Sequence, residues 1–163
     1  MFYKRLTGMV LLLLALAFPA SASMVCFMVV ETGINEGASS GQYSSLWEGG
    51  LMAVFFEAGH IVTNSPIVRI EKKPSLDISS AFESDFDEAV NGGADYFILA
   101  FLEYKDQGER AVPTGMALKL YNSITRALVY EQNFPAGTGR TLDEEYQIAQ
   151  NAGRIIISHL KDR

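Results

Sequence analysis

The stretch SSLWEGGLMAVFFEAGHIV, residues 44–62, decides how the rest of the chain is arranged. It predicts an apolar helix that ends at Gly59, where a left-handed residue is favoured, and passes directly into a strand. Ser45 and Glu48 have the spacing of a capping box at the helix start. The apolar face of this helix consists of Trp47, Leu51, Val54, Phe55 and Ala58. Such a helix is stable only when it packs against other elements, so we expect a sheet beside it.

Three apolar runs predict the strands nearest to this helix. A continuous run at 25–30 is typical of a strand that is covered on both faces. The segment 60–71 predicts a second strand, and its Pro66 favours a position at the sheet edge. The run 96–102 is the most apolar of the three and predicts a central strand.

A hairpin and two further helices complete the predicted elements. Alternating residues predict strands at 116–121 and 127–134, joined by the turn Asn122-Ser123-Ile124-Thr125, and the polar stretch 105–113 predicts a loop. The helices are marked by capping-box pairs, Ser80 with Glu83 and Thr141 with Glu144, and the last one is expected to run to about Leu160. Their apolar faces consist of Phe82, Phe86, Ala89 and Val90 in the first and of Ala149, Ala152, Ile155, Ile156 and Leu160 in the second.

The order of these elements is β-α-β-α-β-β-β-α, which predicts an α/β fold (α+β mixed sheet) with three helices. Two strand–helix–strand crossovers imply a parallel core, because such connections are right-handed and join parallel strands. The hairpin then extends the sheet in antiparallel fashion. We expect five strands in the order 2-1-3-4-5, with the strand that contains Pro66 at the edge.

The first 22 residues have the three regions of a secretory signal peptide. Lys4 and Arg5 form a basic start, an apolar run follows at 10–18, and the small residues at 20–22 predict cleavage after Ala22. The run is shorter than the roughly 20 residues that span a bilayer. We therefore expect residues 23–163 to form a single domain that is exported, with the periplasm as its destination.

The single cysteine allows two interpretations, a lipid anchor or a buried core thiol. Cys26 could be the lipid-bearing first residue of a lipoprotein, but Val25 stands before it where a small residue is needed. A buried core thiol is the preferred interpretation, and lipid anchoring at Cys26 is the alternative. With one cysteine the chain can form no internal disulfide.

Composition and charge exclude several classes of function. The net charge of the 163-residue chain is −6, and removal of the leader takes away two positive charges and no negative ones. A basic face is the usual requirement for nucleic-acid binding, so no nucleic-acid partner is expected. No ligand pattern for a metal or a cofactor is present, and none is expected.

The order of elements, the step from helix through Gly59 to strand, and the turn at 122–125 together resemble a set of exported bacterial domains. These are the N-terminal domain of TolB and the periplasmic domains of the CsgG and LpoB lipoproteins. Their late hairpin has a turn that reads Asp-x-x-Thr-Gly, where this chain has Asn122 for the acid and Arg126 for the glycine. The resemblance implies an envelope protein that binds another protein or assembles with itself, without catalysis.

The chain offers no complete set of catalytic residues. Nucleophilic catalysis needs a base, and the two histidines are interpreted as structural: His60 as a turn residue and His159 as a cation in a last helical turn. Asp85, Asp87 and Glu88 could bind a cation, although an acidic helix face is usually only solvated. A hydrolase with an unrecognised site is the weakest hypothesis.

The Gly/Ser-rich stretch 31–43 is the best candidate for a recognition loop. Long segments without periodicity are uncommon within a compact domain and are often functional. We expect Asn35, Gln42 and Tyr43 to make the contacts. The leading hypothesis is a non-catalytic envelope domain that binds a protein partner or itself; the alternative is a small-ligand or anion-binding protein that uses this loop at the start of the first helix.

Overall fold

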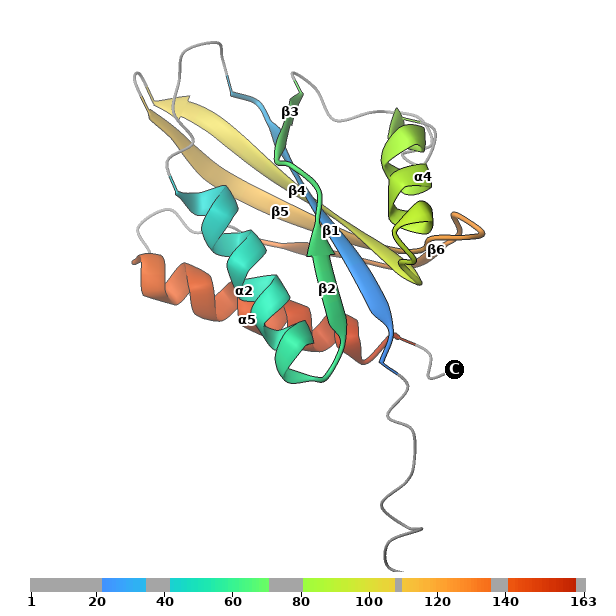
Figure 1. The fold of residues 1–163 in the computed structure, drawn as a ribbon. Coiled ribbons are helices and arrows are strands. Elements are labelled where there is room, and N and C mark those ends of the chain that lie inside the picture. The colour runs from blue at the N-terminus through green and yellow to red at the C-terminus, as the bar shows by residue number, and fades with distance from the viewer. Residues whose placement is uncertain (1–21, 35–41, 71–80, 108–109, 136–140, 161–163) are drawn as a thin grey trace, which may run out of the picture.

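The computed structural model describes residues 22–34, 42–70, 81–107, 110–135 and 141–160 (Figure 1). These residues form one mixed sheet with helices on both of its faces. The elements in chain order are β1 (Met24–Thr32), α2 (Tyr43–Glu57), β2 (Ile61–Asn64), β3 (Val68–Ile70), α4 (Glu83–Asn91), β4 (Tyr96–Gln107), β5 (Arg110–Asn122), β6 (Leu128–Phe134) and α5 (Leu142–Ile157).

The strands follow the order β2-β1-β4-β5-β6, with β3 also paired to β1. β1 is parallel to β2, β3 and β4, and β4, β5 and β6 are antiparallel to one another. The predicted fold class and strand order are confirmed. The predicted edge strand consists of two segments, because Pro66 has no N–H to donate to the pairing between them.

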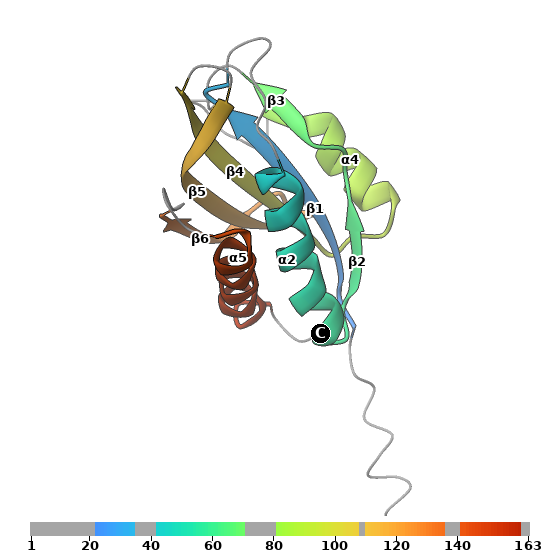
Figure 2. The same ribbon diagram turned by 90° about the vertical axis from the view of Figure 1, so that its left-hand side faces the viewer.

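The two faces of the sheet are covered unequally. Helices α2 and α5 lie side by side on one face, and the shorter α4 lies on the other (Figure 2). Trp47, Leu51 and Phe55 of α2 are fully buried on the first face, and Phe86 of α4 packs edge-on against Phe97 on the second. Burying each of these large side chains stabilises the fold by about 1.5–3 kcal/mol.

Two glycines allow α2 and α5 to approach closely. A methyl group on Gly50 would lie 2.7 Å from the Cβ atom of Ala149, and one on Gly153 would lie 2.4 Å from the Cγ2 atom of Val54. Real side chains do not approach each other so closely, so the helix pair depends on these two positions. Between the helices, Trp47 Nε1 donates a hydrogen bond of 3.1 Å to the buried carboxylate of Glu145.

At the amino end of the parallel strands, where β1, β2 and β4 begin, the same turn from helix through glycine to strand occurs twice. Gly59 after α2 and Gly93 after α4 both have φ +87°, and each lets the chain turn from a helix into a strand. The predicted left-handed Gly59 is confirmed. At this end Asn122 Oδ1 also accepts hydrogen bonds from Thr125 N and Oγ1, and Arg126 at the end of this turn takes φ +57°.

Some predicted helix details are wrong. Helix α2 begins at Tyr43 with Gln42 as its N-cap and no side-chain cap, so Ser45 and Glu48 form no capping box. Ala58 lies beyond the helix and is exposed, and Val90 and Ile155 are exposed although they were expected on apolar faces. The capping box of Thr141 and Glu144 is confirmed, whereas Ser80 lies outside the described residues.

Strand β1 and the β4–β5 hairpin are longer than predicted. Pairing continues through Asp106–Ala111 and Gln107–Arg110, so most of the expected polar loop 105–113 belongs to the sheet. Pro113 is accommodated because the register shifts between Glu103 and Tyr104, the residue opposite it. Glu31 lies within β1 rather than in the loop that follows it.

Candidate functional site

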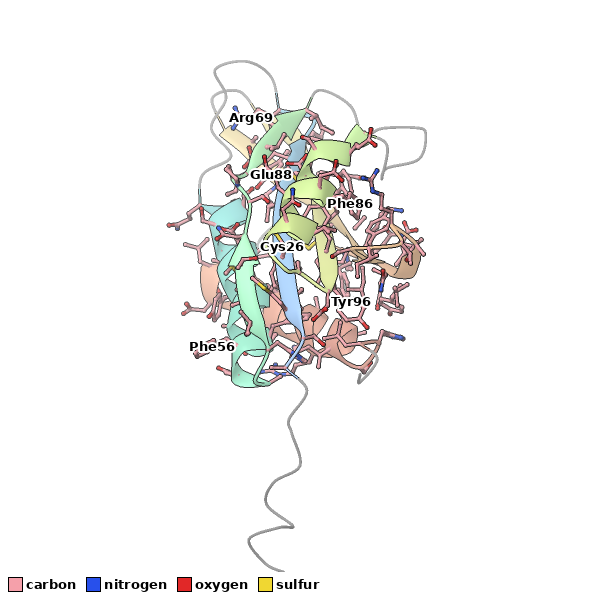
Figure 3. The ribbon with its side chains drawn as sticks, turned by 45° about the vertical axis from the view of Figure 1, so that its right-hand side comes forward. Cys26, Phe56, Arg69, Phe86, Glu88 and Tyr96 are labelled. Carbon is pink, nitrogen blue, oxygen red and sulfur yellow. The ribbon has the colours of Figure 1, made fainter. Side chains whose placement is uncertain are left out.

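The carboxyl end of the parallel strands, where β1 and β3 finish and α2 begins, brings together polar side chains from four elements. In open α/β sheets, ligands bind outside the carboxyl ends of the strands. Figure 3 shows Arg69 at this end, with Phe56 at the opposite one. Four residues form what we call the Glu31 cluster: Glu31 of β1, Ser44 of α2, Arg69 of β3 and Tyr104 of β4.

The Glu31 cluster is a continuous chain of hydrogen bonds. Ser44 Oγ donates to Glu31 Oε1 over 2.6 Å, and Arg69 Nε and Nη2 donate to Glu31 Oε2 over 3.1 and 3.0 Å. Because the single proton of Ser44 is given to the carboxylate, the Tyr104 hydroxyl is the donor in its 2.8 Å bond with Ser44 Oγ. Both oxygens of Glu31 are therefore occupied by groups of the protein itself.

Burial makes this cluster strongly interdependent. The side chain of Glu31 is 6% exposed, whereas that of Arg69 is 43% exposed. Removing the arginine would leave a buried carboxylate without its counter-charge, which is the costly way to break such a pair. Burial also raises the pKa of Tyr104 well above its ordinary value of 10; the bond with Ser44 offsets part of this rise, and the nearby Glu31 charge adds to it.

The exit of the chain from β1 is fixed next to this cluster. Gly33 has φ +76°, and a Cβ atom there would lie 2.5 Å from the backbone oxygen of Tyr104. Only glycine fits this close contact of two backbones. Ile34 then lies 7% exposed in the core on the α2 side of the sheet. The chain between Ile34 and α2 therefore starts from a rigid position and ends at another, where Ser44 is bonded to Glu31.

The predicted recognition residues lie at this same end, as far as they are described. Asn35 falls outside the described residues. Gln42 is exposed and caps α2 without a side-chain hydrogen bond, and Tyr43 is half-buried and packs against the core. The structure thus places two of the three next to Ser44, and their contact role stays a prediction.

The two histidines lie beyond the ends of α2 and α5. His60 follows the last turn of α2, and the helix runs about 20 Å from Ser44 to its last residue, Glu57. His159 follows α5, and its ring stacks on Tyr130 with centroids 3.7 Å apart. Ser44 itself is only 2% exposed and donates its proton to a carboxylate that is paired with Arg69. The Ser44 hydroxyl is thus engaged within the cluster, where it joins α2 to β1.

The acidic helix α4 does not gather its carboxylates around a cation position. Asp87 and Glu83 bind the guanidinium of Arg126 over 2.6 and 3.0 Å. Asp85 has a raised pKa, caused mainly by its burial and then by the charge of Glu88. Within the described ranges, no group of three or more His, Cys, Asp or Glu side chains could hold a metal ion.

The anion-binding alternative meets an obstacle at the start of α2. A helix N-terminus attracts anions through its free N–H groups and its dipole. Here the carboxylate of Glu31 already lies against the first turn, 2.6 Å from Ser44 Oγ. A second anion at this place would be repelled by it. A shallow depression elsewhere, along α5, is lined by Asp143, Glu144, Gln147 and Ile148 and would repel anions as well.

Cys26 lies in the interior, as the core-thiol interpretation expects. It is 6% exposed, and its Sγ atom lies 3.8 Å from Ser65 Oγ. If Cys26 were the first residue of a lipoprotein, the cleavage before it would also remove Met24 and Val25, which pair with Ile61 and Val62 of β2. No helix in the described part of the chain is both long and apolar enough to cross a membrane.

Sequence reasoning missed the four members of the Glu31 cluster. One signal was present: Glu31 directly continues an uninterrupted apolar run, where a carboxylate is expensive to bury unless it is paired. Its partners could not be read from the sequence, because they come from positions 13 to 73 residues further along the chain and meet only in the folded sheet.

Comparisons with known proteins extend to the fold and no further. No protein-family model matches the chain, and no curated protein matches it. Among solved structures, the PelC dodecamer from Paraburkholderia phytofirmans is similar with 15% identity and a TM-score of 0.49, covering 88% of this chain and 91% of that chain. TolB from Acinetobacter baumannii is similar with 15% identity and a TM-score of 0.44, and the match covers 88% of this chain and 29% of that chain. The LpoB C-terminal domain from Escherichia coli is similar with 13% identity and a TM-score of 0.42, and the match covers 75% of this chain and 88% of that chain. The resemblance to TolB and LpoB is confirmed at the level of the fold.

Proposed function

We propose that the chain is an exported envelope domain without catalytic activity, and that it acts by binding a protein partner or a second copy of itself. The contact surface in this proposal is the carboxyl end of the sheet, with the segment 33–42 between β1 and α2 at its centre. The leader pattern of residues 1–22 supports export. The buried thiol of Cys26 supports a domain without a lipid on that residue.

The observation that carries the proposal is the Glu31 cluster. Its buried groups satisfy one another, so they offer no open position to a small substrate. What they do is fix the two anchors of the loop, the end of β1 and the start of α2, in one arrangement. A recognition surface gains affinity when its anchors are held before the partner arrives, because less conformational freedom is lost on binding.

Light scattering and affinity capture test this proposal together. Residues 23–163 would be examined for mass in solution and used to capture partners from envelope extract. We expect an oligomer or a specific partner, and we expect Gln42→Arg to weaken it while Glu57→Arg, at the exposed opposite end of α2, has little effect. A monomer that captures nothing would contradict the proposal.

Thermal denaturation with a panel of anions and metabolites tests the alternative. A ligand present at 100 times its Kd would stabilise the domain by about 2.7 kcal/mol. We expect no such stabilisation by phosphate or sulfate, because Glu31 lies at the start of α2. A clear increase in the melting temperature, absent from a Gln42→Glu variant, would favour the ligand-binding function instead.

A further inference from the structure

The chain changes from exposed to buried at the predicted cleavage bond. Ala22 is exposed, Ser23 is 4% exposed, and Met24 is already the first residue of β1. The bond that a signal peptidase is expected to cut joins Ala22 to Ser23. No spacer therefore separates this bond from the folded domain.

The backbone beyond the bond is held on both sides. On one side, the carbonyl of Ser23 accepts a hydrogen bond of 3.1 Å from the backbone N–H of Ile61, at the start of β2. On the other side, Met24 N donates to Asp95 Oδ2 over 3.0 Å, and Asp95 N donates to the carbonyl of Met24 over 2.7 Å. The two residues that follow the bond are thus held in place: Met24 is the first residue of β1, and Ser23 is hydrogen-bonded to the start of β2.

Asp95 connects this start of β1 to the hairpin turn as well. Its carbonyl accepts a hydrogen bond of 3.0 Å from the backbone N–H of Ser123, which is completely buried. One residue therefore joins β1, the beginning of β4 and the turn after β5. Releasing residues 23–25 would break these bonds and expose Val25, which is 0% exposed in the folded domain.

We propose that folding protects the Ala22–Ser23 bond, so that the leader must be removed before β1 takes its place between β2 and β4. This inference rests on the proposed export of the chain. A chain that folds first keeps its leader, including the apolar run at 10–18. The order of folding and cleavage therefore decides whether the domain of residues 23–163 is separated from the leader.

The physical reason is that a peptidase needs the backbone on both sides of its bond to be accessible. Cleavage in folded proteins concentrates at exposed segments, and its feasibility depends on the burial and hydrogen bonding of the affected backbone. A buried bond is cut only during transient opening, so its cleavage rate falls with the small population of the open form.

Cleavage of the folded precursor by a purified bacterial signal peptidase in detergent tests the proposal. The full chain 1–163 would be compared with a variant that carries four inserted residues, Gly-Ser-Gly-Ser, between Ser23 and Met24. The insertion keeps the residues around the bond and moves them away from β1. We expect the folded variant to be cut about tenfold faster or more, and both chains to be cut equally when diluted from urea directly into the peptidase.

A point variant gives a second measure. Asp95→Ala removes the carboxylate that binds Met24 N, and we expect it to accelerate cleavage of the folded full chain at Ala22–Ser23. If this variant does not fold, the insertion variant still provides the test. Equal cleavage rates for the folded unmodified chain and the folded insertion variant would contradict the protection of the bond by folding, without contradicting export. If neither chain were cleaved when diluted from urea, the predicted signal peptide would be wrong, and this inference with it.

Discussion

The two ends of the sheet are built in different ways. At the amino end, the same turn from helix through glycine to strand occurs twice, at Gly59 and Gly93, and backbone groups make most of the connections. At the carboxyl end, the connection between β1 and α2 is held by side chains of four elements, the Glu31 cluster. The amino end therefore relies on backbone groups and glycine, and the carboxyl end on contacts between side chains.

This difference indicates where the chain can carry function. A turn made by backbone and glycine stabilises the fold and presents little chemistry. A cluster of a buried carboxylate, an arginine, a serine and a tyrosine costs desolvation, which an apolar core of the same size would avoid. We therefore propose that the cluster positions the proposed recognition segment between β1 and α2.

Alanine substitution of one arginine at each end of the sheet should give the largest difference in stability between the two ends. Arg69→Ala leaves the buried Glu31 without its counter-charge and should lower the free energy of unfolding by about 3 kcal/mol. Arg126→Ala at the amino end removes ion pairs with Glu83 and Asp87, which are 67% and 60% exposed, and should change the stability much less. Urea denaturation of both variants measures the difference. Equal losses would contradict the distinction between the two ends.

Two glycines with positive φ provide the next test. Gly33→Ala should cost about 2–3 kcal/mol, because its methyl group would meet the backbone oxygen of Tyr104 in addition to the unfavourable φ. Gly59→Ala should cost about 1–2 kcal/mol, because no atom lies within 4 Å of a Cβ there and only the left-handed backbone is penalised. Thermal denaturation would rank them. A larger loss at Gly59 would show that the close approach at the carboxyl end is not required.

The Tyr104 hydroxyl makes the carboxyl end sensitive to alkaline pH. Its pKa is raised in the folded state, so below the ordinary value of 10 both states are protonated and the stability is unaffected. Above pH 10 the unfolded chain loses this proton and the folded chain retains it, so the stability falls by up to about 1.4 kcal/mol per pH unit. Tyr104→Phe should lose stability more slowly between pH 10 and 11 in urea titrations. If the stability of the two proteins fell equally with rising pH, the assignment of the Tyr104 hydroxyl as a buried hydrogen-bond donor would be contradicted.

The smallest effects concern helix starts. Thr141→Ala removes an observed capping box and should cost about 1 kcal/mol, whereas Ser45→Ala should be neutral within about 0.5 kcal/mol. Thermal denaturation of the two variants separates them. A cost at Ser45 that equals the cost at Thr141 would mean that α2 begins with the cap that the sequence pattern predicts.

The amino end and the strand order could be predicted because they depend on local patterns. Gly59 terminates its helix in the expected conformation, and Pro66 marks the edge strand and divides it into β2 and β3. Apolar periodicity was also sufficient to identify the three helices and the central strand β4. These features follow from backbone sterics and from the burial of one helix face.

The carboxyl end could not be predicted because it depends on long-range contacts. The hydroxyl of Ser44 binds Glu31 and Tyr104, and α2 begins one residue before it, at Tyr43, rather than at the local pair of Ser45 and Glu48. The extension of β1 to Thr32 likewise depends on its pairing with β3 and β4. Local propensity was overridden at the place to which we assign recognition.

The most direct measurement of the central claim is a site-specific crosslink in living cells. A photoreactive amino acid would replace Gln42 at the carboxyl end, and Glu57, exposed at the other end of the same helix, would serve as the matched control. We predict a discrete adduct with a protein partner or a second copy from position 42 and none from position 57. An adduct from position 57 alone, or from neither position in a folded and exported chain, would contradict the claim.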